Sequence, residues 1–131
     1  MGNKMYALNC QVYFVQVVGG GPIKIGCAGH AESRVTALQN YCPYKIELLG
    51  HIPGNEAHER WLHSLLSSER LRGEWFHSTL ITRSVVKAVL DSCFEWPDPL
   101  PKKFNVRRLF MRGQSLPGGS IGNDMVELPA Q

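Results

Sequence analysis

The sequence has no apolar run of about 18 residues, the length that a helix needs to cross a bilayer. It therefore predicts no transmembrane helix and no membrane partner. The first ten residues contain neither a long apolar segment nor a cleavage site, so we predict no signal peptide and a cytoplasmic location. The chain also lacks a repeat with a period of about 20–50 residues, which is the signature of repeat architectures.

Cysteine is scarce, and the four that occur lie far apart in the sequence. Cys10, Cys27, Cys42 and Cys93 form no Cys-x-x-Cys motif, which indicates free and mostly buried thiols in a reducing compartment. Cys27 and His30 have a spacing that metal sites use, but a matching second pair is missing. Because structural zinc sites usually take four ligands, such a site is not expected.

Charge is modest, since 14 Lys and Arg against 11 Asp and Glu give a net charge of +3 with neutral His. This balance permits a nucleic-acid partner without arguing strongly for one. The length of 131 residues suits one domain. We divide the chain into a lead-in at 1–10, a domain at 11–92 and a Pro- and Gly-rich basic tail at 93–131. Lys102 and Lys103 in this tail are either solvated or in contact with phosphates, and disorder of the tail stays an open alternative.

Two short apolar runs near the start of the chain predict a β-hairpin with strands at 11–18 and 22–27. The Gly-Gly-Gly run 19–21 separates them, and we expect all three glycines to supply positive φ angles. Pro22 cannot donate a ladder hydrogen bond, so it should stand at the entry of the second strand. The hairpin carries Tyr13 on one strand and Lys24 on the other, two titratable groups in apolar strands.

A third β-prone run follows at 45–52, and helical spacing of apolar residues predicts helices at 32–40, 56–68 and about 78–92. Asn55 is the expected N-cap of the second helix. The sequence therefore predicts an α+β fold, in which a small, three-stranded, mainly antiparallel sheet is flanked by helices.

The helix at 56–68 has the clearest pattern. One apolar stripe is formed by Ala57, Trp61, Leu62, Leu65 and Leu66. At about 100° per residue, Glu59 falls on the border of this stripe, with His63 one turn further on the same side. Glu56 and Arg60 point away from it. A satisfied, half-buried histidine is the expected state of His58.

Four of these polar residues occur in a characteristic order, and the chain resembles the GIY-YIG nuclease superfamily in its phage and bacterial branch. The first motif is matched by Val12-Tyr13, the second by Lys24-Ile25-Gly26, the helical arginine by Arg34, and the metal-binding glutamate by Glu59. The run 70–76 is similar to the element that closes this branch's domain, and the resemblance covers roughly residues 11–90.

Three departures from the family pattern are visible. Lys24 stands where the wider family has a tyrosine, Gln11 precedes Val12 where a glycine is usual, and the family's late asparagine has no match. Lysine at the second-motif position looks common in this branch, so its presence does not by itself indicate lost activity. The missing asparagine leaves the support of the metal-side helix open.

The resemblance implies a divalent-metal-dependent endonuclease that hydrolyses phosphodiester bonds in DNA, with RNA as an open alternative. Glu59 would hold one Mg²⁺ or Mn²⁺ ion, which acts as a Lewis acid. Arg34 offers a fork of donors to phosphate oxygens. Either Tyr13 or Lys24 could take the proton from the attacking water. The further residues expected to contact nucleic acid are Arg70, Arg72, Lys102 and Lys103.

Each of the four residues also has an ordinary structural explanation. Tyr13 alone suits core packing, Lys24 a strand edge, Arg34 a solvated helix face, and Glu59 a pair with His63. The alternative functions are therefore a non-catalytic nucleic-acid-binding module on the same scaffold and, less favoured, a protein-interaction module of phage or mobile-element origin.

The aromatic pair Trp75 and Phe76 also has two explanations. These rings could stack on bases. Covering the apolar core is the better explanation, because the helices and strands need cover at that end.

Overall fold

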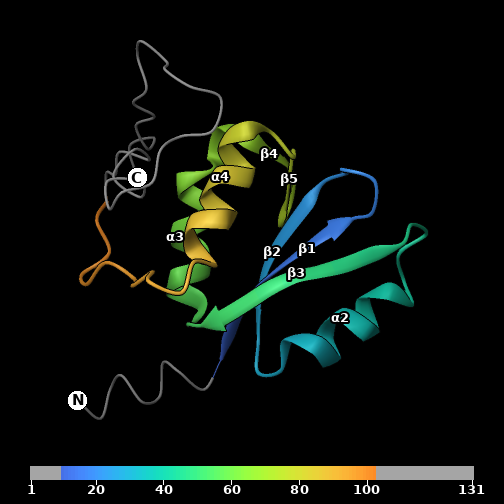
Figure 1. Ribbon diagram of the computed structural model, residues 1–131, viewed down its shortest axis with the longest axis horizontal. Helices are drawn as coiled ribbons and strands as arrows, with labels where there is room; N and C mark the ends of the chain where they lie inside the picture. Colours follow the sequence, from blue (N-terminus) through green and yellow to red (C-terminus); the bar gives the residue numbers. More distant parts are fainter. Residues whose placement is uncertain (1–9, 103–131) are drawn as a thin grey trace.

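The computed structural model describes residues 10–102, in which one β-sheet carries helices on both faces (Figure 1). The elements in chain order are β1 (Gln11–Val17), β2 (Ile23–Ala28), α2 (Ala31–Gln39), β3 (Ile46–Pro53), α3 (Glu56–Leu65), a 3₁₀ turn η1 (Ser67–Glu69), β4 (Arg70–Arg72), β5 (Trp75–Phe76) and α4 (Leu80–Val89). No helix within this part of the chain is long and apolar enough to span a bilayer.

The sheet has the strand order β3-β1-β2-β5-β4, and every neighbouring pair is antiparallel. The expected α+β class is confirmed, but the sheet has five strands, not three. The two additional strands, β4 and β5, contain three and two residues. Such short strands show no measurable alternation of apolar and polar residues, which is why the sequence pattern does not predict them.

The β1–β2 hairpin is confirmed, with Phe14 opposite Ile25. Gly19 and Gly20 have φ angles of 96° and 84°, in the left-handed region. The expectation of a positive φ at Gly21 is wrong. There the constraint is space, because a Cβ would lie 2.7 Å from the Cβ of Val17.

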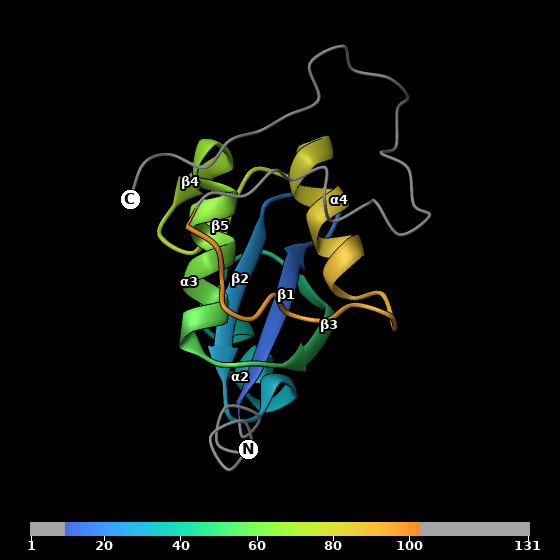
Figure 2. The ribbon, with the colours of Figure 1, turned by 90° about the vertical axis from the view of Figure 1, so that its left-hand side faces the viewer.

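Alternation along β1 divides the apolar side chains between two cores. On one face Val12 and Phe14 pack beneath α3 and α4, and on the other face Tyr13 and Val15 pack beneath α2. Figure 2 shows α3 and α4 in front of the sheet, with α2 behind it. Because both faces are covered, β1 shows a nearly continuous apolar run.

The helix boundaries follow local capping. The amide oxygen of Asn55 accepts hydrogen bonds from the N–H groups of Ala57 and His58, and Nδ1 of the His58 ring accepts one from the Asn55 N–H. These bonds form a capping box and confirm the expected N-cap. The helix predicted to reach residue 68 ends at Leu65, and the chain continues into η1. Ala57 is exposed and does not belong to the apolar stripe.

The four cysteines are free, as expected, but the expectation that they are mostly buried is wrong. Cys93 is exposed, and the other three are partly exposed.

The segment that follows α4 packs against the first core. Phe94, Trp96 and Leu100 contact it. The Trp96 ring stacks on His58 with the ring centroids 4.3 Å apart, and its Nε1 donates a hydrogen bond of 2.8 Å to the Pro53 carbonyl. Figure 2 shows this segment crossing from α4 towards α3. Packing therefore continues past the expected boundary at residue 92, whereas the predicted lead-in at 1–9 and tail at 103–131 lie outside the described residues.

We expect Trp96→Ala to lower the free energy of unfolding by about 2 kcal/mol, because it removes a half-buried ring and a hydrogen bond. Urea unfolding measures the change, and Cys93→Ala in the same segment, where the side chain is exposed, is the control. A urea midpoint for Trp96→Ala equal to that of the control would show that the segment does not contribute to the domain.

Candidate active site

Lys24 of β2 and Tyr13 of β1 meet on the α2 side of the sheet. Their strands pair so that Lys24 lies opposite Val15, and Tyr13 lies opposite Gly26. The Lys24 ammonium donates a hydrogen bond of 3.1 Å to the Tyr13 hydroxyl, which belongs to a fully buried side chain. The predicted pair of titratable groups in the hairpin is therefore in direct contact.

Gly26 makes room for this contact. A Cβ at this position would lie 2.4 Å from the Tyr13 hydroxyl oxygen, closer than a real Cβ atom approaches another heavy atom. The glycine of the Lys24-Ile25-Gly26 run is thus required by the position of the Tyr13 side chain, not by an unusual backbone angle.

Glu74 supplies a carboxylate that the sequence reasoning did not include among the site residues. It lies in the turn between β4 and β5, where Gly73 has a φ of 58°, and its carbonyl accepts a hydrogen bond of 3.0 Å from the Ile25 N–H. Its side chain forms an ion pair with Lys24. The only signal in the sequence is a glycine followed by an acid and two aromatic residues, within the run similar to the family's closing element.

Glu59 reaches the same place from α3. Its side chain is 10% exposed and lies beside Glu74, close enough for the two carboxyl groups to share a hydrogen bond when Glu59 is protonated. Glu56 lies on the solvent side of the helix, where it faces Arg60 at 3.8 Å. The predicted orientation of Glu59 is confirmed, and Glu56 does not take its place.

The pKa values of the cluster are shifted in different directions. Burial, followed by the hydrogen bond and charge of Glu74, raises the pKa of Glu59 from 4.5 to about 7. Burial alone would raise the pKa of Glu74 too, but the hydrogen bond and charge of Lys24 outweigh it and lower that pKa. Burial alone would lower the pKa of Lys24, yet its bonds to Glu74 and Tyr13 raise it. Near neutral pH, Lys24 and Glu74 are therefore charged, and Glu59 is close to its titration point.

His63 flanks the carboxylates. Its Nε2 lies 2.9 Å from the Ile25 carbonyl, an arrangement in which this nitrogen carries the proton and donates it. The same nitrogen is 3.8 Å from Glu59, and burial lowers the pKa of His63. A neutral His63 thus links α3 to β2 and holds one wall of the site, at the place expected from its spacing to Glu59.

Arg34 lies on α2 with an exposed side chain. Ala31 and Leu38 of this helix face the sheet, and Gln39 bonds the Ile46 N–H at 2.9 Å on the β3 side. Five residues separate Arg34 from Gln39, which places their side chains about 140° apart around the helix axis. Arg34 therefore lies on the flank of α2 opposite to Gln39 and away from β3.

The other basic residues predicted to contact nucleic acid lie in different places. Arg70 and Arg72 are exposed on the edge strand β4, and the Arg70 guanidinium is 5.5 Å from the centre of the Phe76 ring. Lys102 is exposed beyond the last helix, and Lys103 lies outside the described residues. Of these predicted nucleic-acid contacts, Arg70 and Arg72 lie close to Glu74, both in the sequence and in the β4–β5 pairing.

Within residues 10–102 no group of three or more His, Cys, Asp or Glu side chains is arranged to hold a metal ion. The pair Glu59 and Glu74 nevertheless fits one type of site. Mg²⁺ usually keeps several waters and is bound by one or two carboxylates together with substrate phosphates. Two adjacent carboxylates in a half-buried position match that donor set.

The fold and the cluster define a small α+β domain. A lysine, a tyrosine and two carboxylates gather in it where the pairing of β2 with β5 ends. The chain belongs to the T5orf172 domain family, whose model matches residues 4–96. T5orf172 domains are found in phage and in GIY-YIG-like and homing endonuclease contexts, which points to a role connected with nucleic acid. No curated protein and no solved structure matches the chain.

The raised pKa of Glu59 makes the stability of the domain depend on pH. Between about pH 4.5 and 7 the folded chain holds a proton that the unfolded chain has released. The stability linked to this proton is therefore fully present below about pH 4.5 and is lost as the pH rises to about 7.

Glu59→Gln is neutral at every pH and should lose this dependence. Relative to wild type, we expect its unfolding free energy to gain about 1–2 kcal/mol between about pH 5 and about pH 8. Urea unfolding in the presence of a chelator at both pH values measures the gain, and Glu56→Gln on the exposed side of α3 is the matched control. The same difference from wild type at both pH values would contradict a buried Glu59 with a raised pKa.

Proposed function

We propose that the protein is a divalent-metal-dependent endonuclease of the GIY-YIG type that hydrolyses phosphodiester bonds in DNA. One observation carries the proposal. Tyr13, Lys24, Glu59 and Glu74 come from four different elements and form one connected cluster at the edge of β2. Membership of the T5orf172 family supports the same conclusion, because these domains occur in endonuclease contexts.

Stability alone does not account for such a cluster. Burying the Lys24 ammonium and the Glu59 carboxyl, whose side chains are 12% and 10% exposed, carries a desolvation penalty, and apolar residues of similar volume are often as stable or more so. Groups with strongly shifted pKa values and specific charge partners are a frequent property of functional sites. The cluster is therefore better explained by chemistry than by packing.

Glu59 and Glu74 are the residues that would hold the ion, Mg²⁺ or Mn²⁺. When bound, the ion supplies Lewis-acid stabilisation of the phosphoryl and leaving oxygens. The Glu59 carboxyl loses its proton near neutral pH. This is compatible with the role, because a carboxylate must be deprotonated to bind a metal.

The two remaining roles, stabilisation of negative charge and proton transfer, belong to Lys24 and Tyr13. Burial alone would lower the pKa of Lys24, but its bonds to Glu74 and Tyr13 outweigh burial and raise it. Lys24 therefore stays protonated and stabilises negative charge. Tyr13, as the phenolate that the ammonium beside its oxygen would stabilise, is then the group that takes the proton from the attacking water and becomes the phenol. Arg34, exposed on α2, binds a phosphate oxygen.

The test compares two glutamates of the same helix. We expect Glu59→Gln to abolish Mg²⁺- or Mn²⁺-dependent nicking of supercoiled plasmid while leaving DNA binding nearly intact, because it removes a metal ligand and no basic contact. Glu56→Gln should nick as wild type does, since its side chain lies in solvent. Equal nicking by both variants would refute the assignment of Glu59. A wild-type protein that binds DNA or RNA but cleaves neither would be a non-catalytic binding module.

Tyr13→Phe isolates the hydroxyl, because the ring and its packing remain. We expect the single-turnover cleavage rate to fall by about 100-fold or more, the range of general acid–base catalysis, with little change in DNA affinity. The melting temperature of the variant verifies that the buried ring is still in place. Cleavage at the wild-type rate would exclude Tyr13 as the proton acceptor.

A further inference from the structure

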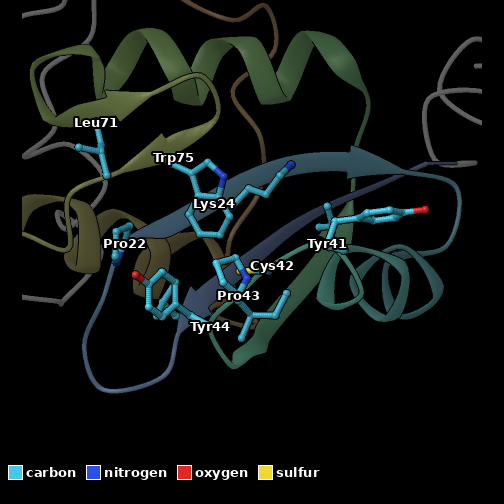
Figure 3. A pocket seen from close by; sticks show the side chains of 11 residues that line it. Pro22, Lys24, Tyr41, Cys42, Pro43, Tyr44, Leu71 and Trp75 are labelled. Atoms are coloured by element: carbon cyan, nitrogen blue, oxygen red, sulfur yellow. The ribbon is translucent and has the colours of Figure 1, made fainter.

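A groove of about 500 Å³ opens beside the candidate active site. One side of the groove is formed by the end of α2 and the start of β3. The other side is formed by β2, β5 and β4. The residues that determine its character are Lys24, Tyr41, Pro43, Tyr44, Leu71 and Trp75. Figure 3 shows Lys24 and Trp75 on one side, Pro43 and Tyr44 on the other, and Tyr41 at one end. Its volume falls within the range of small-ligand sites, about 300–1,000 Å³.

The aromatic rings of this groove are exposed to a degree that core packing does not explain. Tyr41 is 88% exposed and Tyr44 is 65% exposed. Together with Leu71 they are three of the five large hydrophobic side chains that stand in solvent within the described residues, and all three line the groove. An exposed ring contributes little to the core, so a concentration of them in one groove indicates a ligand with flat apolar faces.

The groove is continuous with the candidate active site through Lys24. The same side chain lines the groove and holds Tyr13 and Glu74 through its ammonium. Lys24 is the one charged residue among those that line the groove, and none of them is acidic. On β4, the exposed Arg72 lies next to Trp75 in the sheet register. A ligand with a negatively charged group at Lys24 and an aromatic part in the groove matches this distribution.

We propose that the groove binds one unpaired nucleobase of the substrate, next to the phosphate that the active site engages. The inference rests on the proposed nuclease function and narrows its substrate class to single-stranded or locally unpaired nucleic acid. Bases inside a duplex are stacked on both faces and cannot enter a groove without leaving the stack. An unpaired base can stack on tyrosine and tryptophan rings with little dependence on sequence.

The experiment measures binding, not cleavage. Fluorescence anisotropy compares a labelled single strand of thymidines with a duplex of the same length, at low salt and with a chelator. We expect wild type to prefer the single strand. Tyr41→Ala and Tyr44→Ala should each weaken single-strand binding by about 5- to 100-fold, the range for loss of one base–aromatic contact. Tyr44→Phe, which keeps the ring, should restore most of the affinity.

Leu49→Ala is the matched control, because Leu49 is also an exposed apolar residue but lies on β3 outside the groove. It should bind as wild type does. The inference is overturned if Tyr44→Ala and Leu49→Ala bind the single strand equally well. It is also overturned if light scattering finds a wild-type dimer that Tyr44→Ala converts to monomer, because the groove is then the interface between two copies.

Failure of this inference can be told apart from failure of the proposed function. If the alanine variants lose single-strand binding while wild type never cleaves, the groove binds a base and the nuclease proposal is wrong. If wild type nicks duplex DNA and the alanine variants nick and bind equally well, the nuclease proposal stands and the groove inference is wrong.

Discussion

The ion pair between Lys24 and Glu74 is the interaction on which the site depends. The β2–β5 pairing comprises two residue pairs, Ile23 with Phe76 and Lys24 with Trp75, so Lys24 lies at the point where it ends. There its ammonium connects β1, through Tyr13, with the β4–β5 turn, through Glu74. Glu74 in turn contacts Glu59 of α3. A half-buried ammonium needs these partners, and removal of one would leave a charge without compensation. One lysine thus holds elements from both faces of the sheet.

This arrangement sets stability against function. The two carboxylates are close enough that burial and mutual repulsion raise the pKa of Glu59, and Gly26 gives up side-chain packing so that the Tyr13 hydroxyl can reach Lys24. A sequence selected only for stability would fill this space with apolar groups. The same lysine also lines the aromatic groove, so the proposed phosphate site and the proposed base site share one residue.

The sequence predicted the parts of this structure that repeat with a period. Alternation along β1 and β2 predicted the hairpin that carries Tyr13 and Lys24, and the helical pattern of α3 predicted that Glu59 faces inward while Glu56 does not. Glu74 was missed because the strands around it are too short for periodicity and its partner lies 50 residues earlier in the chain. Trp96 was missed because the prolines around it resemble a linker, although its ring packs on His58. Contacts of this kind depend on the tertiary fold, which local patterns do not encode.

The central claim is that Glu59 and Glu74 form the metal-binding part of an active site beside Tyr13 and Lys24. Diffraction from crystals soaked in Mn²⁺ tests it most directly, because anomalous scattering locates the ion without reference to activity. The account predicts one strong anomalous peak at the carboxylates of Glu59 and Glu74, which is lost in crystals of Glu59→Gln. A peak at Glu56, or no peak near Glu59 in well-diffracting soaked crystals, would contradict it.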